Sequence, residues 1–369
     1  MNKPRITTPQ LRPSEATAPT GLWAAWVRFW FTPTDPTGLH ALRLLTGLLV
    51  LTWLLGFAGQ ENALFGLRGW FDTQAYKDAS RLPNTANMPA PITWSLVYLC
   101  GEDENLVTAL YWSSVLVVAL FTLGVATRIT SVMTWLAVAS FTANPAISYD
   151  GDVLLLMLTF YLMIGYVLLG WWHGDLKGMG RLIGGSKCLI LGPSDKPPSV
   201  AANVAVRLIQ VHFAIIVVVS ALHKLQSGDW WSGTALWYPL FPPFQTKLAE
   251  IREMAPRRDF YLVALSLATY AALLWQLAFP FFAWRPRWRI VLLGGAVVGW
   301  IGTAFVYKLP IFGPAYLIGA LSYLTEDEWR FLTGWLRRLP ILERIMGSRQ
   351  APSAEMEARR SVKSAVTTG

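Results

Sequence analysis

The sequence is poor in cysteine, histidine and charged residues, and each shortage argues against a particular class of protein. Two cysteines and four histidines in 369 residues leave no CxxC pair, no HExxH helix and no cluster with metal-ligand spacing, so we expect no metal site. Charged residues make up only 14% of the chain, whereas soluble domains carry about 25%. The composition therefore argues against a water-soluble globular domain.

Long apolar runs take the place of the missing charge. Hydrophobic residues make up 54% of the chain, and the mean hydropathy is +0.40. Since a helix needs about 20 apolar residues to cross the hydrocarbon of a bilayer, we identify about eight candidate spans. We therefore predict an all-α fold, a polytopic transmembrane helix bundle embedded in the lipid bilayer. The expected spans are roughly 38–58, 105–125, 129–147, 151–172, 204–223, 260–283, 288–307 and 311–324.

The distribution of Lys and Arg predicts the orientation of the bundle. With the N-terminus inside, the segments on the inner side hold most of the basic residues, and excess positive charge stays cytoplasmic. We therefore expect both termini in the cytoplasm and a multi-pass protein of the cytoplasmic (inner) membrane of a bacterium. The net charge of +9 follows from this bias, so we expect no nucleic acid partner.

Composition divides the chain into four segments. Residues 1–35 are polar and Pro-rich and read as a flexible cytoplasmic arm, while residues 36–324 hold the spans. Residues 325–346 alternate charge with Trp, Phe and Leu at helical spacing, which predicts an amphipathic helix on the inner membrane surface. Residues 347–369 are predicted to be a disordered tail.

Polar residues converge at the outer ends of two predicted spans. One group lies in the turn "NPAISYDGD", and another follows the apolar run "FAIIVVVSAL", where Lys224 stands at the end of the span. An ionisable residue at membrane depth is costly and marks a functional site by default. The candidate catalytic residues are Lys224, Asp152, Asp150 and His223, and the candidate substrate-binding residues are Asn144, Asp229, Trp230 and Trp231.

Several of these residues also have plainer interpretations. Asp150 and Asp152 are suited to cap the following helix, Lys224 at a helix end can reach the interface, and the tryptophans suit an interfacial belt. His40 and Arg43 are expected to snorkel to the inner surface, and His212 at mid-span to hydrogen-bond to another helix.

Because an unpaired charge at membrane depth is costly, we expect Lys224 to lie within ion-pair reach of Asp150 or Asp152.

Four stretches together resemble a known family. The run "SALHKLQSGDWWSGTALWY" around Lys224, "GLHALRLLTG" with Arg43, "TLGVATRITSV" with Gly124 and Arg128, and "NPAISYDGDVLL" followed by "WWHGDL" occur in the family's order. They resemble the HTTM family of membrane proteins, related to the membrane domain of vitamin K-dependent gamma-carboxylase. The resemblance is strongest over residues 35–245.

The resemblance implies a role for Lys224. In the carboxylase, the lysine of the corresponding "KL" motif is the base that deprotonates reduced vitamin K, so the resemblance implies carboxylase-like lyase or quinone-linked chemistry, with a quinone or vitamin K-like hydroquinone as cofactor. The chain differs where the carboxylase has a histidine near the position of Asp152. It also has no counterpart, in the segment after the last span, to the large C-terminal part of the carboxylase, so gamma-carboxylation of proteins is not expected.

Two interpretations of function remain open at this stage. The first is an HTTM-type protein with an outward-facing polar site around Lys224 that acts on a lipid-soluble small molecule. The alternative is a non-catalytic membrane partner or maturation factor for an exported protein, in which Lys224 and an aspartate form a structural ion pair. Transport is less supported, because no predicted span is clearly broken at mid-membrane.

Overall fold

The computed structural model describes residues 21–66, 69–82, 94–100, 103–148, 151–169, 198–241, 246–307, 309 and 311–337. Within these ranges the chain is helical, and the only β-pairing is a single antiparallel bridge between Thr34 and Ser199. This confirms the predicted all-α fold. The helices are α1 (Leu22–Phe31), α2 (Thr37–Leu55), α3 (Glu61–Phe65), α4 (Thr73–Ser80), α5 (Val97–Cys100), α6 (Glu104–Leu123), α7 (Thr127–Thr142), α8 (Gly151–Leu168), α10 (Val200–Leu225), α11 (Gly228–Trp231), α12 (Trp237–Leu240), α13 (Leu248–Met254), η1 (Ala255–Arg257), α14 (Arg258–Phe282), α15 (Pro286–Phe305), α16 (Phe312–Leu321) and α17 (Glu326–Arg337).

Six helical segments in the described ranges are long and apolar enough to cross a membrane. They comprise α2, α6, α8, α10, the continuous stretch Leu248–Phe282 that ends with α14, and α15. The other two of the eight expected spans correspond to the shorter helices α7 and α16, of 16 and 10 residues. The chain is thus a multi-pass helical bundle.

Local sequence explains where the helices begin and end. Asp103 precedes α6 and accepts a hydrogen bond from the backbone N–H of Asn105, and Ser199 caps α10 in a similar way. Gly124 ends α6 with φ of 83°, a left-handed conformation that a residue with a Cβ adopts only with strain. Pro286 occupies the first turn of α15, where its missing N–H costs nothing.

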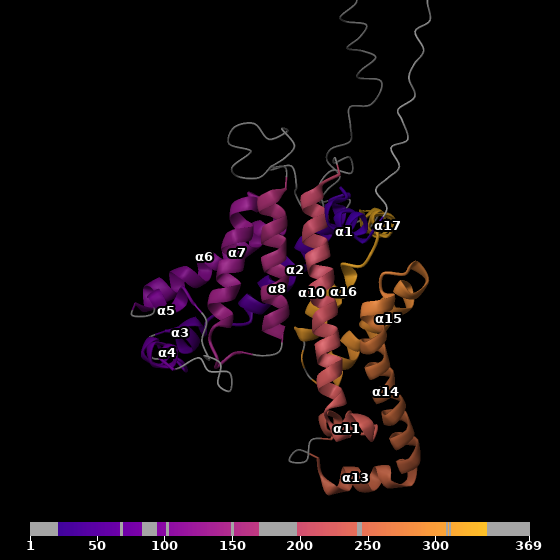
Figure 1. The fold of residues 1–369 in the computed structure, drawn as a ribbon. Helices are drawn as coiled ribbons and strands as arrows, with labels where there is room; N and C mark the ends of the chain where they lie inside the picture. Colours follow the sequence, from indigo (N-terminus) through magenta and orange to yellow (C-terminus); the bar gives the residue numbers. More distant parts are fainter. Residues whose placement is uncertain are drawn as a thin grey trace, which may run out of the picture.

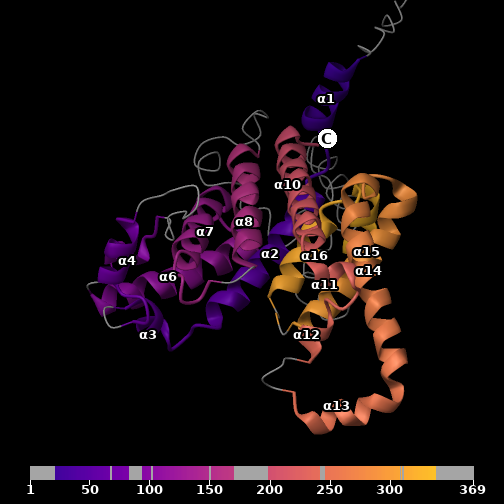
Figure 2. The same cartoon turned by 60° about the horizontal axis from the view of Figure 1, so that its bottom comes forward.

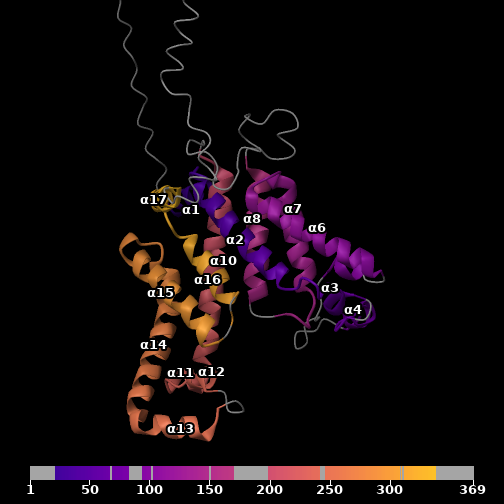
Figure 3. The same ribbon diagram turned by 180° about the vertical axis from the view of Figure 1, so that it is seen from behind.

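The core of the bundle forms around α2, which packs against α6, α8 and α16. Its residues Leu39, Leu42, Val50 and Leu54 have no exposed surface. The long helices run up the page in Figure 1, and α8 and α10 lie side by side in front of α2. Seen from behind, α14, α15 and α16 flank the same bundle on the other side (Figure 3).

One end of the bundle, which we call the terminal end, holds α1, α17 and the start of α2 and α10 (Figure 1). The backbones of Thr34 and Ser199 exchange two hydrogen bonds there. The side-chain amide of Asn203 donates to the carbonyls of Phe29 and Trp30, in the last turn of α1. The opposite end, with α11 and α13, is the far end.

Part of the segment expected to be a flexible arm is therefore a docked helix. Its residues 1–20 lie outside the described residues, but Leu22–Phe31 forms α1 against α10. The helix α17 begins one residue after the start of the predicted amphipathic segment 325–346, and the predicted tail 347–369 lies outside the described residues.

Candidate functional site

Lys224 lies in the last turn of α10 at the far end and is half-buried. Its Nζ lies 2.7 Å from Oε1 of Gln276 on α14 and 3.2 Å from Oγ of Ser220, one turn back on α10. Gln276 is itself buried, and its amide lies 3.4 Å from the same Ser220 hydroxyl. The lysine thus bridges two helices through neutral, polar side chains.

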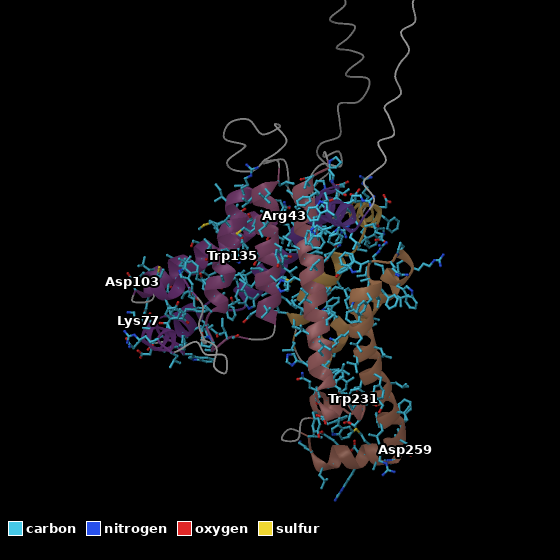
Figure 4. All side chains as sticks on the ribbon, viewed as in Figure 1. Arg43, Lys77, Asp103, Trp135, Trp231 and Asp259 are labelled. Carbon is cyan, nitrogen blue, oxygen red and sulfur yellow. The ribbon has the colours of Figure 1, made fainter. Side chains whose placement is uncertain are left out.

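Aromatic residues form the second part of this site. The ring of Trp230, in the short helix α11, lies with its centroid 4.9 Å from the Lys224 ammonium. The neighbouring Trp231 donates its indole N–H to the carbonyl of Leu225, and its own carbonyl accepts from the Tyr270 hydroxyl on α14. These bonds hold α11 between α10 and α14, and Trp230 is thereby positioned beside the lysine. Figure 4 labels Trp231 in this far part of the bundle.

The turn that follows α11 is tightly constrained. Gly233 has φ of +76°, and a Cβ added there would lie 2.9 Å from the Cβ of Ser266 on α14. Only glycine fits both the backbone conformation and the space. The segment after Lys224 is therefore folded back against α14 by its own local sequence.

Lys224 does not form the predicted ion pair with Asp152, one of its two expected partners. Among the described residues, the ammonium of Lys224 pairs with no carboxylate, and its hydrogen bonds go to Ser220 and Gln276. The physical reason is the length of α10, which continues past the level where α8 begins and carries Lys224 away from α8 towards α14 (Figure 1). Asp150 lies outside the described residues.

The other candidate residues are distributed over two environments. Asp152 is buried in the first turn of α8, where its carboxylate complements the helix dipole. Asn144 is fully buried and bonds to the carbonyl of Leu64, so it fastens α3 to the end of α7. His223 and Asp229 are exposed beside Lys224. The structure therefore places Lys224, His223, Asp229, Trp230 and Trp231 together at the end of α10 and in α11. Asn144 and Asp152 lie apart from them, at the end of α7 and the start of α8.

Gln276 is the residue of this site that the sequence motifs did not predict. It lies within the predicted span 260–283, outside the stretch that carries the family resemblance. Its signal is a single amide side chain inside an otherwise apolar helix, because such a group must find a hydrogen-bond partner within the bundle.

A second polar cluster lies near the terminal end and corrects another expectation. His40 and Arg43 do not snorkel to the surface, since neither has exposed area. Nδ1 of His40 lies 2.6 Å from the Tyr166 hydroxyl on α8, and Arg43 donates to the same oxygen at 3.4 Å. Arg128 likewise is buried and donates to the carbonyl of Leu169 at 2.6 Å. These arginines hold α2 and α7 to α8; Figure 4 labels Arg43.

The prediction for His212 is confirmed. Its Nδ1 lies 3.0 Å from the hydroxyl of Tyr161 on the neighbouring helix α8. No group of three or more His, Cys, Asp or Glu side chains in the described ranges is arranged to hold a metal ion.

Comparison with protein-family models, with curated proteins and with solved structures gives no match for this chain. The family resemblance therefore rests on the sequence motifs alone.

Proposed function

We propose that the chain is a multi-pass membrane protein of the HTTM type, in which Lys224 acts as a base towards a lipid-soluble small molecule at an outward-facing site. The observation that carries this proposal is the contact of 2.7 Å between the Lys224 Nζ and the neutral Oε1 of Gln276, without a carboxylate partner among the described residues. A neighbouring aspartate would hold the lysine in its charged form, whereas a neutral amide does not.

The geometry suits a proton transfer at Nζ. A neutral lysine amine can donate one N–H to Gln276 and keep its lone pair available to accept a proton. Burial at the end of an apolar helix favours this neutral form. After the transfer, the face of Trp230 at 4.9 Å stabilises the ammonium by a cation–π interaction. Proton abstraction by a positioned side chain is general base catalysis.

The residues present also suit the cofactor that the resemblance implies. Trp230 offers an aromatic surface beside the Lys224 amine, and aromatic side chains with a few placed polar groups are typical of sites for small molecules such as a quinone or vitamin K-like hydroquinone. When bound, the reduced (hydroquinone) form would supply the reducing electrons. Gamma-carboxylation of a protein substrate is not part of the proposal. The alternative, a non-catalytic membrane partner or maturation factor, calls for a carboxylate beside Lys224, whereas its contacts among the described residues are Ser220 and Gln276.

The proposal is tested with the variants Lys224→Ala and Lys224→Arg in the full chain. We expect both variants to fold and neither to deprotonate the substrate. Alanine has no basic group, and arginine keeps a positive charge but does not act as a base near neutral pH. The probe is the hydroquinone of menadione under anaerobic conditions, whose absorbance changes when its hydroxyl loses a proton. The control is Lys247→Ala, an exposed lysine before α13. An unchanged absorbance shift in a well-folded Lys224→Ala protein would overturn the proposal.

A further inference from the structure

The helix α1 exposes apolar surface along most of its length. Leu22 is 92% exposed, Trp23 76% and Trp26 54%. Among the described residues, the end of the helix that leads into α2 is held to the bundle by the hydrogen bonds of Asn203 to the carbonyls of Phe29 and Trp30. Surface of this composition is unfavourable in contact with water. The described residues leave this apolar surface uncovered.

The direction of α1 indicates what covers this surface. In Figure 1, where α8 and α10 run up the page, α1 and α17 are seen foreshortened at the terminal end; after the turn of Figure 2, α1 appears at full length. Both helices therefore run across the direction of the spans, level with the ends of α2 and α10. A helix in this position lies along the plane of a membrane surface.

The helix α17 presents a matching surface. Its Trp329 is buried against the bundle, while Phe331 and Trp335 are 73% and 58% exposed. Tryptophan is enriched where the hydrocarbon of a bilayer meets the head groups. The helices α1 and α17, at one end of the bundle, thus both expose tryptophan, the residue that is favoured where hydrocarbon meets the head groups.

Exposed arginines accompany these tryptophans. Arg285 immediately precedes α15 and Arg287 lies in its first turn, next to Trp288, which is 52% exposed. The turn between α14 and α15 adjoins α1, because the rings of Trp284 and Phe29 are 5.5 Å apart. Arg28 on α1 is also exposed. None of these three arginines forms an ion pair with another residue in the described parts of the chain.

We propose that this end of the bundle binds anionic phospholipid through an aromatic and basic collar made of Trp26, Trp288, Trp335, Arg28, Arg285 and Arg287. The tryptophans lie at the head-group level, and the arginines contact lipid phosphates, for which guanidinium groups form two parallel hydrogen bonds. Attraction to anionic lipid adds to the burial of apolar side chains. The collar is independent of the chemistry at Lys224, which lies at the far end of α10.

The depth of α1 is tested first. In a full chain carrying Cys100→Ser and Cys188→Ser, a spin label is attached at Trp26→Cys or, as a reference on the same end, at the exposed Asp327→Cys. After reconstitution in phosphatidylcholine vesicles with phosphatidylglycerol, the label at position 26 should collide more with oxygen than with a water-soluble nickel complex, and the label at 327 should do the reverse. Equal behaviour at both positions would overturn the proposal, as would protection of position 26 from both agents, which would mean that protein covers α1.

The lipid preference is tested with matched arginine variants. Arg285→Gln with Arg287→Gln removes charge from the collar, while Arg252→Gln with Arg257→Gln removes two exposed arginines at the far end. Native mass spectrometry then measures phosphatidylglycerol and phosphatidylcholine retained by each protein. The collar variant should retain about tenfold less phosphatidylglycerol, with little change in phosphatidylcholine. Equal losses in the two double variants, or none in the collar variant, would overturn the proposal.

Discussion

Two cations of the bundle, Arg43 and Lys224, lie in different surroundings. Arg43 has no exposed surface, donates to the Tyr166 hydroxyl and lies 5.6 Å from the centroid of the same ring. It is a fixed part of the packing between α2 and α8. Lys224 is half-buried and meets a single neutral amide oxygen at 2.7 Å. A lysine in such surroundings changes its protonation state more readily than an arginine, which stays charged.

Gln276 provides the sharpest single-residue prediction. Gln276→Glu replaces the neutral oxygen beside the Lys224 Nζ with a carboxylate, which should hold the lysine charged and abolish deprotonation of the menadione hydroquinone. Because the new pair satisfies both charges, the variant should still fold. The measurement combines the absorbance shift with thermal unfolding in detergent.

Gln276→Leu is the matching control. It removes the hydrogen bond without adding charge, so it should retain a measurable part of the absorbance shift, and thermal unfolding should show a loss of about 1 kcal/mol. If Gln276→Glu kept full activity, the neutral partner would have no role in the chemistry at Lys224.

At the scale of elements, α17 is fastened to the terminal end by two ion pairs. Arg330 on α17 lies 2.8 Å from Asp35, which precedes α2, and Glu328 on α17 lies 2.8 Å from Arg289 of α15. The ring of Trp329 packs so closely on Gly38 that a Cβ there would lie 2.9 Å from it. The C-terminal helix therefore connects the first and the last spans.

This attachment predicts a dependence on pH. Burial by itself raises the pKa of Asp35, but hydrogen bonds from Thr37 and Arg330 outweigh it and hold that pKa below its ordinary value. Burial likewise raises the pKa of Glu328, but hydrogen bonds from Thr325 and Arg289 outweigh this effect and hold that pKa below its ordinary value. A carboxyl group whose pKa is lowered by folding contributes stability that is present above about pH 4 and is lost as the pH falls through the lowered value.

We therefore expect α17 to loosen from the bundle in acid. Hydrogen exchange of its backbone amides, corrected for the intrinsic effect of pH, should show protection at pH 6 that is lost progressively as the pH falls below about 4. Asp35→Asn should weaken protection already at pH 6, since it removes the charge that pairs with Arg330. Protection that stays constant over this range would show that packing of Trp329 alone holds the helix.

At the scale of the whole molecule, the arrangement of spans predicts which segments share a side of the membrane. Ser148 follows α7 and Ser227 follows α10. The α7–α8 connection and the end of α10 that leads into α11 both lie away from the terminal end (Figure 1). Thr32, after α1, lies at the terminal end and is exposed. In a chain without its two native cysteines, single cysteines at 148 and 227 should react with a membrane-impermeant reagent applied from outside, and a cysteine at 32 only after the membrane is opened. Labelling of position 32 from outside with protection of the other two would reverse the proposed orientation.

The sequence by itself determined the class of the molecule. Apolar runs of about 20 residues predict membrane helices because hydrophobicity and helix formation are local properties of the chain, and six such helical segments are present in the described residues. The same local reasoning predicted the hydrogen bond of His212 to another helix, since a polar group at mid-span must find a partner inside the bundle. It also predicted a helix after the last span, where α17 lies.

Only the tertiary structure decided which side chains meet. The sequence suggested Asp150 or Asp152 as the partner of Lys224 because each stands at the end of a span. Asp152, however, begins a helix of 18 residues, whereas α10 has 26. This difference in length, together with the rotation of each helix about its axis, brings Lys224 to Gln276 on α14. Arg43 was expected to reach the inner surface because its position in the sequence places it near the end of its span. Sequence position gives the depth of a residue in its own span, but the facing helix decides whether the side chain reaches water. Here the facing helix is α8, and Arg43 contacts its Tyr166 instead.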